Sequence, residues 1–184
     1  MIYSFLQNGD SAVTVQFKNE ISEEVNRRVT GLCNRIEAKH IDGIVELVPT
    51  FASLTVFYDC TIISSKKLKK KVEALINGKE CDVKSTAKVW NIPVCYDDEF
   101  ALDMKNVCSH TTLEREEVIK LHTSKPYLIY MLGFLPGFAY LGGMDERLFT
   151  PRLKTPRLEI FEGAVGIGGE QTGIYPIASP GGWQ

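Results

Sequence analysis

Two arginines on a stiff segment are the strongest candidates for chemistry in this 184-residue chain. Arg152 and Arg157 each follow a proline within the stretch TPRLKTPR of residues 150–157. Because proline restricts the backbone of its own residue and of the one before it, these prolines hold the segment extended. Guanidinium groups on such a segment suit bidentate capture of a carboxylate or phosphoryl group. Pairing with surface acids is the competing interpretation, and the residues leave both open.

A glycine-rich block precedes these arginines. Residues 133–143 read GFLPGFAYLGG and contain the candidate pocket residues Pro136, Gly137, Phe138 and Tyr140. Glycine and proline permit backbone paths that other residues avoid, so the block predicts a loop of defined shape. Its aromatic side chains either fill a core or form one wall of a pocket.

A second glycine-rich block covers residues 163–182 and leads directly into Trp183. Polar and aromatic side chains interrupt the glycines, which together favour a small-molecule pocket. The same residue types also close turns and barrels, so both interpretations stay open. The candidates from this part of the chain are Gln171, Thr172, Tyr175, Ser179 and Trp183.

Composition argues against several classes of protein. A net charge of -2 gives no electrostatic footprint for nucleic acid or an anionic membrane. The five cysteines form no C-x-x-C pair, and the N-terminus lacks the pattern of a signal peptide, so a cytoplasmic protein with reduced thiols is expected. The lysine-rich run of residues 66–71 is interpreted as the solvated face of a helix.

The spacing of titratable residues also predicts no metal site, because the three histidines lie at no ligand spacing. No phosphate-binding loop or nucleophile elbow occurs. Any nucleotide must therefore be held in another way, or by another polypeptide.

The fold class expected from the pattern is α+β, in two domains. Residues 1–85 predict a small βαββαβ domain with both helices on one face of its sheet. Its expected strands cover residues 12–17, 44–48, 53–58 and 82–92, and its expected helices cover residues 22–40 and 65–77. Residues 86–184 predict a mostly β domain, a barrel or sandwich, with a helical insert at 103–122.

At these motifs the chain resembles a known family. The blocks at residues 133–143, 150–157, 165–176 and 178–184 resemble the B subunit of 5-oxoprolinase, and so do shorter motifs that end at Tyr96 and His122. This family also includes allophanate hydrolase subunit 1 and the sporulation histidine-kinase inhibitor, and it is carboxyltransferase-domain C/D-like. The likeness spans nearly the whole chain.

The resemblance implies a cyclophilin-like β-barrel as the second domain. It implies two partners, a second barrel-containing protein of the 5-oxoprolinase C-subunit type and the lactam-opening A-subunit, which together open 5-oxo-L-proline to L-glutamate with ATP. Arg152 and Arg157 would then hold the substrate carboxylate or a developing phosphate. The alternatives are an inhibitor that binds a sensor histidine kinase and an allophanate or urea hydrolase subunit. Family members continue past the final Gly-Gly-Trp-Gln, so the barrel is expected to be truncated at its C-terminus.

Overall fold

The computed structural model describes residues 3–76 and 88–184. Two compact units divide the chain, Met1–Thr86 and Ala87–Gln184. Among the described residues, no helix is both long and apolar enough to cross a membrane.

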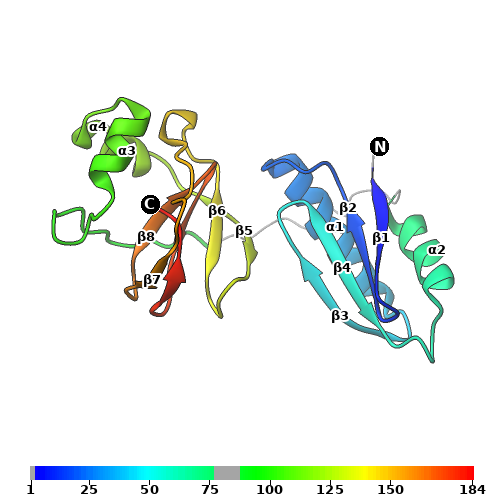
Figure 1. The fold of residues 1–184 in the computed structure, drawn as a ribbon. Helices are drawn as coiled ribbons and strands as arrows, with labels where there is room; N and C mark the ends of the chain where they lie inside the picture. Colours follow the sequence, from blue (N-terminus) through cyan, green and yellow to red (C-terminus); the bar gives the residue numbers. More distant parts are fainter. Residues whose placement is uncertain (1–2, 77–87) are drawn as a thin grey trace. The chain divides into compact units, whose positions relative to one another are not determined.

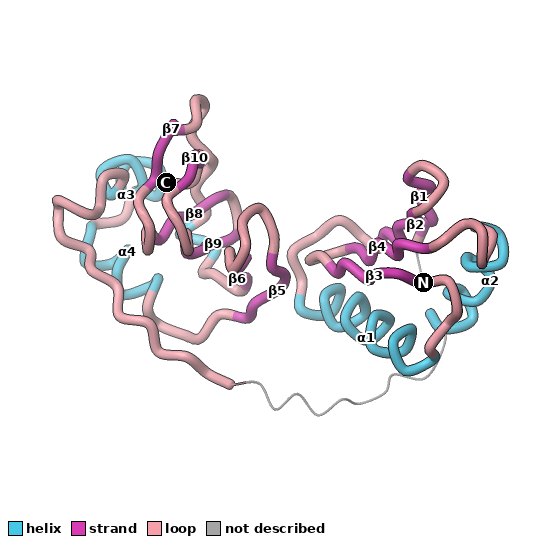
Figure 2. The backbone as a smooth tube through the Cα atoms, turned by 90° about the horizontal axis from the view of Figure 1, so that it is seen from below, coloured by secondary structure: helices cyan, strands magenta, loops and turns pink. Residues whose placement is uncertain are grey.

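The first unit is a four-stranded antiparallel sheet with two helices. Its strands lie in the order β1 (Ser4–Asn8), β2 (Ala12–Gln16), β4 (Ser53–Tyr58) and β3 (Ile44–Pro49). The helices are α1 (Glu23–Lys39) and α2 (Ser65–Ile76). Figures 1 and 2 show both helices on one face of the sheet, as the sequence predicts.

One hydrophobic core explains this arrangement. Side chains of a strand alternate between its two faces, so Val13 and Val15 of β2 point the same way as Leu54 and Val56 of β4. These four valine and leucine side chains share a buried cluster with the apolar stripes of both helices, including Leu32 of α1 and Leu68 of α2. The 3.6-residue spacing of those stripes is what made both helices predictable.

The predicted order of the strands in this unit is wrong at its beginning. The described order is β-β-α-β-β-α, because β1 precedes the first strand expected from the sequence. β1 is an edge strand in which Phe5 alone is half-buried, so it carries no alternating pattern. It exists because a turn at Gly9, with φ 65°, folds it back onto β2.

The strand predicted over residues 82–92 is also not found where it can be checked. Residues 82–87 lie outside the described residues, and residues 88–92 form no strand. Valine and isoleucine gave these residues a strand-like composition, yet Val89 and Ile92 are 68% and 58% exposed. Without a buried face or a neighbouring strand, a strand-like composition alone does not give a hydrogen-bonded strand.

The second unit combines helices and two small antiparallel sheets. Its helices are α3 (Met104–Thr111), α4 (Arg115–His122) and the 3₁₀ turn η1 (Glu146–Leu148). The larger sheet has the order β5 (Leu128–Leu132), β6 (Ala139–Gly142), β9 (Gln171–Ile174) and β8 (Val165–Gly168). β7 (Arg157–Ile160) pairs with β10 (Ser179–Gly181) in the smaller one.

The larger sheet separates two hydrophobic clusters. On one face, Ile167 of β8 packs with the apolar sides of α3 and α4, including Val107 and Val118. On the other face lie Phe138, Tyr175 and Trp183. The chain end adds to this sheet, because Gln184 and Ile167 exchange two backbone hydrogen bonds of 2.5 and 2.9 Å. The glycine-rich loop of residues 133–138 joins β5 to β6, and its Phe134 and Phe138 rings contact Tyr175.

Candidate functional site

Trp183 lies against a strip of glycines on the sheet. A methyl group built on Gly168 would come within 2.4 Å of the indole, and one on Gly166 or Gly173 would come within 3.0 Å of Trp183 atoms. Real side chains do not approach as closely as 2.4 Å, so Gly168 must lack a side chain for the indole to sit there, and contacts at 3.0 Å make Gly166 and Gly173 tight as well. The second glycine-rich block thus shapes a flat seat for one aromatic ring.

The loop of residues 133–143 supplies more rings to the same place. The Phe138 ring centroid lies 4.9 Å from that of Tyr140, 5.0 Å from Tyr175 and 5.5 Å from Trp183, all edge-on. Phe138 is almost fully buried, at 1% exposure. The structure therefore brings together the aromatic candidates of both glycine-rich blocks, which the sequence could only place in separate segments.

The two candidate arginines differ in their partners. Arg157 donates to Asp103 Oδ1 at 2.6 Å, in a pair whose side chains are 31% and 11% exposed. Arg152 is exposed, and its guanidinium carbon lies 5.6 Å from the centre of the Trp183 ring. Within residues 3–76 and 88–184, Arg152 has no ion pair. The spacing suggested two equivalent arginines, but their environments differ. Arg157 is paired with a carboxylate, whereas Arg152 makes a cation–π contact and no ion pair within the described residues.

The remaining candidates fall around this cluster. Gln171 and Ser179 are each 7% exposed, and Gln171 Nε2 and Ser179 Oγ have no hydrogen-bond partner among the described residues. Pro136 and Gly137 are exposed at the tip of the loop, where Gly137 adopts φ 84° beside Pro176. Buried polar atoms without a partner are rare in proteins, so the two orphans require a reason.

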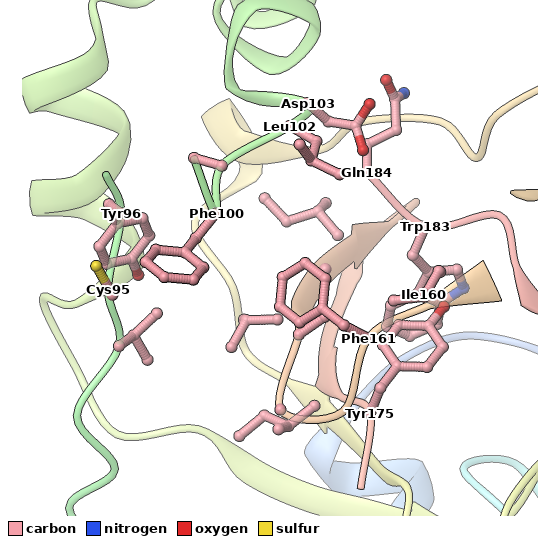
Figure 3. A pocket seen from close by; sticks show the side chains of 18 of the residues that line it. Cys95, Tyr96, Phe100, Leu102, Asp103, Ile160, Phe161, Tyr175, Trp183 and Gln184 are labelled. Carbon is pink, nitrogen blue, oxygen red and sulfur yellow. The ribbon is translucent and has the colours of Figure 1, made fainter. Parts of the chain in front are cut away.

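A cavity of about 310 Å³ opens in the same unit. Figure 3 shows Tyr96 and Phe100 on one side and Phe161, Tyr175 and Trp183 on the other, with Asp103 near the top. Most of the wall is apolar, and its charged residues are the paired Arg157 and Asp103 together with Glu159 and Glu162. Of the residues expected to form the pocket, Arg157, Tyr175 and Trp183 line this cavity.

A chain of hydrogen bonds runs from the cavity wall into the sheet. Thr172 donates its single hydroxyl proton to the carbonyl oxygen of Gly166 at 3.0 Å, since that oxygen can only accept. His122 Nε2, 2.9 Å from Thr172 Oγ1, must therefore carry a proton and donate it. Burial lowers the pKa of His122, which favours the neutral ring. Its bare Nδ1 then accepts from the Tyr96 hydroxyl at 2.6 Å.

Surrounding contacts fix this chain in place. Arg115 donates to the backbone oxygen of Tyr96 and pairs with Asp98, which anchors the cavity segment to the start of α4. The Tyr127 hydroxyl donates to the backbone oxygen of His122 at 2.7 Å. Burial also raises the pKa of Tyr96, so its phenol stays protonated at neutral pH. The cavity thus ends in an uncharged, fixed phenol that can still accept a hydrogen bond.

The sequence did not single out Tyr96 and His122 as site residues. They lie 26 residues apart, and neither has a spacing that is typical of catalysis. Their one signal was their place at the ends of two motifs shared with the resembled family. Together, the cavity and the aromatic cluster provide apolar walls, one unpaired cation and several hydrogen-bonding groups, which suit binding and orientation of a small polar ring.

Comparison with known proteins gives a match across almost the whole chain. Residues 3–184 match the family described as carboxyltransferase domain, subdomain C and D. The 5-oxoprolinase B-subunit of Bacillus subtilis (strain 168) is 44% identical over 192 residues, a match that covers 99% of this chain and 80% of that relative.

Solved structures share the fold. A crystal structure of TTHA0988 is 36% identical with a TM-score of 0.77, and the match covers 94% of this chain. This chain accounts for only 33% of the length of that one. The K. lactis urea amidolyase, 22% identical, matches 99% of this chain and 12% of its own length with a TM-score of 0.80, which shows a common fold alone.

Proposed function

The chain belongs to the carboxyltransferase domain, subdomain C and D, family, and on this premise we propose that it is one component of an ATP-dependent 5-oxoprolinase. In this role it helps to open 5-oxo-L-proline to L-glutamate. The observation that carries the proposal is the 44% identity, over 99% of the chain, to a protein named as the B-subunit of 5-oxoprolinase. The resemblance inferred from the motifs is confirmed by the same match.

The site chemistry supports a shared rather than a self-sufficient active site. His122 has both ring nitrogens engaged, with Tyr96 and Thr172, and Arg157 is paired with Asp103. These groups are fixed for binding and orientation, and none is arranged as an activated nucleophile beside a free base. The proposal therefore includes two partners, a second barrel-containing protein of the C-subunit type and the lactam-opening A-subunit, with ATP held by the assembled complex in the cytoplasm.

The proposal extends to the fold and to the site. The two units correspond to two domains, and the second is a cyclophilin-like barrel. The residues that form or support the substrate pocket are those that surround the aromatic cluster and the adjoining loop, with the buried Phe138 and Thr172 supporting it from behind and Thr172 acting through His122. In full they are Pro136, Gly137, Phe138, Tyr140, Arg152, Arg157, Gln171, Thr172, Tyr175, Ser179 and Trp183.

Reconstitution tests this function. The chain is purified with its two presumed partners, and L-glutamate release from 5-oxo-L-proline is measured with and without ATP. The expected result is release that needs ATP and all three polypeptides. Undiminished release in the absence of this chain would overturn the proposal.

The assay also separates the alternatives. Because the urea amidolyase shares this fold, allophanate and urea are supplied in parallel reactions, and preference for either would replace 5-oxoproline as the substrate. Inhibition of histidine-kinase autophosphorylation by the chain, together with no lactam opening, would assign it to regulation instead.

A further inference from the structure

The geometry points to a carboxylate subsite on the aromatic face of the larger sheet, formed by Arg152, Gln171 and Tyr140 around the indole of Trp183. This inference rests on the proposed function for the identity of the ligand, which is the carboxylate of 5-oxo-L-proline. Trp183 also lines the cavity, whereas Arg152, Gln171 and Tyr140 lie outside its lining.

Arg152 provides the charge of the subsite. Its guanidinium carbon lies 5.6 Å from the centre of the Trp183 ring, within the range of a cation–π contact. This contact helps to hold the Arg152 side chain beside the indole. None of its N–H groups donates to an acceptor within the described parts of the chain. A guanidinium whose N–H groups are free can bind a carboxylate through two of them.

Gln171 provides the buried donor. It pairs with Gly168 across the β8–β9 ladder, so its side chain leaves the sheet on the face where the indole covers Gly168. Directly opposed Cβ positions are about 5 Å apart, which places Gln171 next to the Nε1 edge of the indole. Gln171 is 7% exposed, and its Nε2 lacks a partner among the described residues. A bound anion would satisfy this donor, which otherwise carries a desolvation cost.

Tyr140 adds a third group on the same face. It pairs with Gly173, which also lies beneath the indole, and its ring centroid is 5.7 Å from that of Trp183. Its hydroxyl has no hydrogen-bond partner within residues 3–76 and 88–184. Glu170, which directly precedes Gln171, is exposed and does not pair with Arg152. Three free donors around one ring, with no carboxylate of the protein among them, favour an anionic ligand.

The counterpart, Arg157, gives the reason for assigning the subsite to Arg152. Arg157 already contacts a carboxylate, Asp103, at 2.6 Å, so a substrate carboxylate there would meet a negative neighbour. Among the described residues, no carboxylate lies within ion-pair distance of Arg152. A small lactam bound at Arg152 would also rest its ring against aromatic side chains.

The test is binding to the whole chain, followed by NMR of the two tryptophan indole N–H signals, with W90F to assign that of Trp183. Adding 5-oxo-L-proline is expected to shift the Trp183 signal saturably. The same lactam without its carboxylate, 2-pyrrolidinone, is expected to give no saturable shift. In R152Q and Q171E the dissociation constant for 5-oxo-L-proline should rise about ten-fold or more, with R152K intermediate.

The matched control is R147Q, which removes an exposed arginine that pairs with Asp145 and Glu117. It should leave binding unchanged. Equal binding of the two lactams, unchanged binding in R152Q, or no saturable shift in the wild type would overturn the subsite. Because glutamate release is measured separately, a complex that is active while R152Q binds normally would refute the subsite and leave the proposed function standing.

Discussion

The imidazole Nε2 of His122 lies 2.9 Å from the hydroxyl oxygen of Thr172, which links helix α4 to strand β9. Thr172 in turn donates to the backbone oxygen of Gly166, so one side chain connects a helix with two strands. His122 is 8% exposed and Thr172 only 1% exposed. A buried, fully satisfied polar contact of this kind specifies one packing of the helix against the sheet.

We predict that Thr172→Val destabilises the second unit by about 1–3 kcal/mol, because a buried N–H of His122 and the oxygen of Gly166 lose their partner. Thr172→Ser keeps the hydroxyl and should lower the free energy of unfolding clearly less than Thr172→Val does. Urea unfolding, followed by Trp183 fluorescence in a W90F background, measures both. Equal losses in the two variants would contradict the role given to the hydroxyl.

Stability of the second unit should fall in mildly acidic solution. Burial lowers the pKa of His122 in the folded chain, so between that value and its ordinary value near 6.5 the unfolded chain binds more protons. The contribution is fully present above the ordinary pKa and is lost as pH falls toward the lowered one. Its slope is at most about 1.4 kcal/mol per pH unit.

Comparison with H122Q isolates the contribution of His122 to the pH dependence of stability, since carboxyl groups contribute equally to both proteins. Free energies of unfolding measured from about pH 7.5 to about pH 5 should decline less steeply in the variant. Parallel curves would show that His122 does not titrate between the two states in this range.

The glycine seat of Trp183 predicts opposite effects of two glycine-to-alanine changes. Gly168→Ala would put a methyl group 2.4 Å from the indole and should destabilise the second unit by about 1–3 kcal/mol or more. Gly31→Ala lies within α1, where the added methyl meets only the flexible end of Arg35 at 3.2 Å. It should stabilise its helix by up to about 1 kcal/mol. Thermal unfolding of both variants measures the two effects. An unchanged stability in Gly168→Ala would contradict the close packing of the indole on Gly168.

Thiol reactivity should separate the cysteines. Burial, reinforced by the neighbouring Glu37, raises the pKa of Cys33 to about 11, so its reactive thiolate is scarce at neutral pH. Cys60 and Cys95 are exposed. In a C81A background, a disulfide reagent should modify Cys60 and Cys95 rapidly and Cys33 only on unfolding. Fast modification of Cys33 in the folded chain, located by mass spectrometry, would contradict its burial.

Local pattern was sufficient for much of the first unit. The apolar stripes of α1 and α2 recur at helical spacing, and β2 and β4 alternate, so each element buries a face that its own sequence marks. β1 escaped because an edge strand buries little, and residues 88–92 misled because their apolar side chains stay exposed. Both errors concern burial, which depends on neighbours that the local sequence does not contain.

The sequence by itself determined the family, through long motifs in order, and the candidate residues of the glycine-rich blocks. Only the tertiary structure decided how they combine. Trp183 packs on Gly168, Arg152 makes a cation–π contact with the indole while Arg157 pairs with Asp103, and His122 joins Tyr96 to Thr172. The physical reason is that residue type and spacing constrain the local backbone. Hydrogen bonds and ring contacts between distant segments arise only when the sheet and helices pack together.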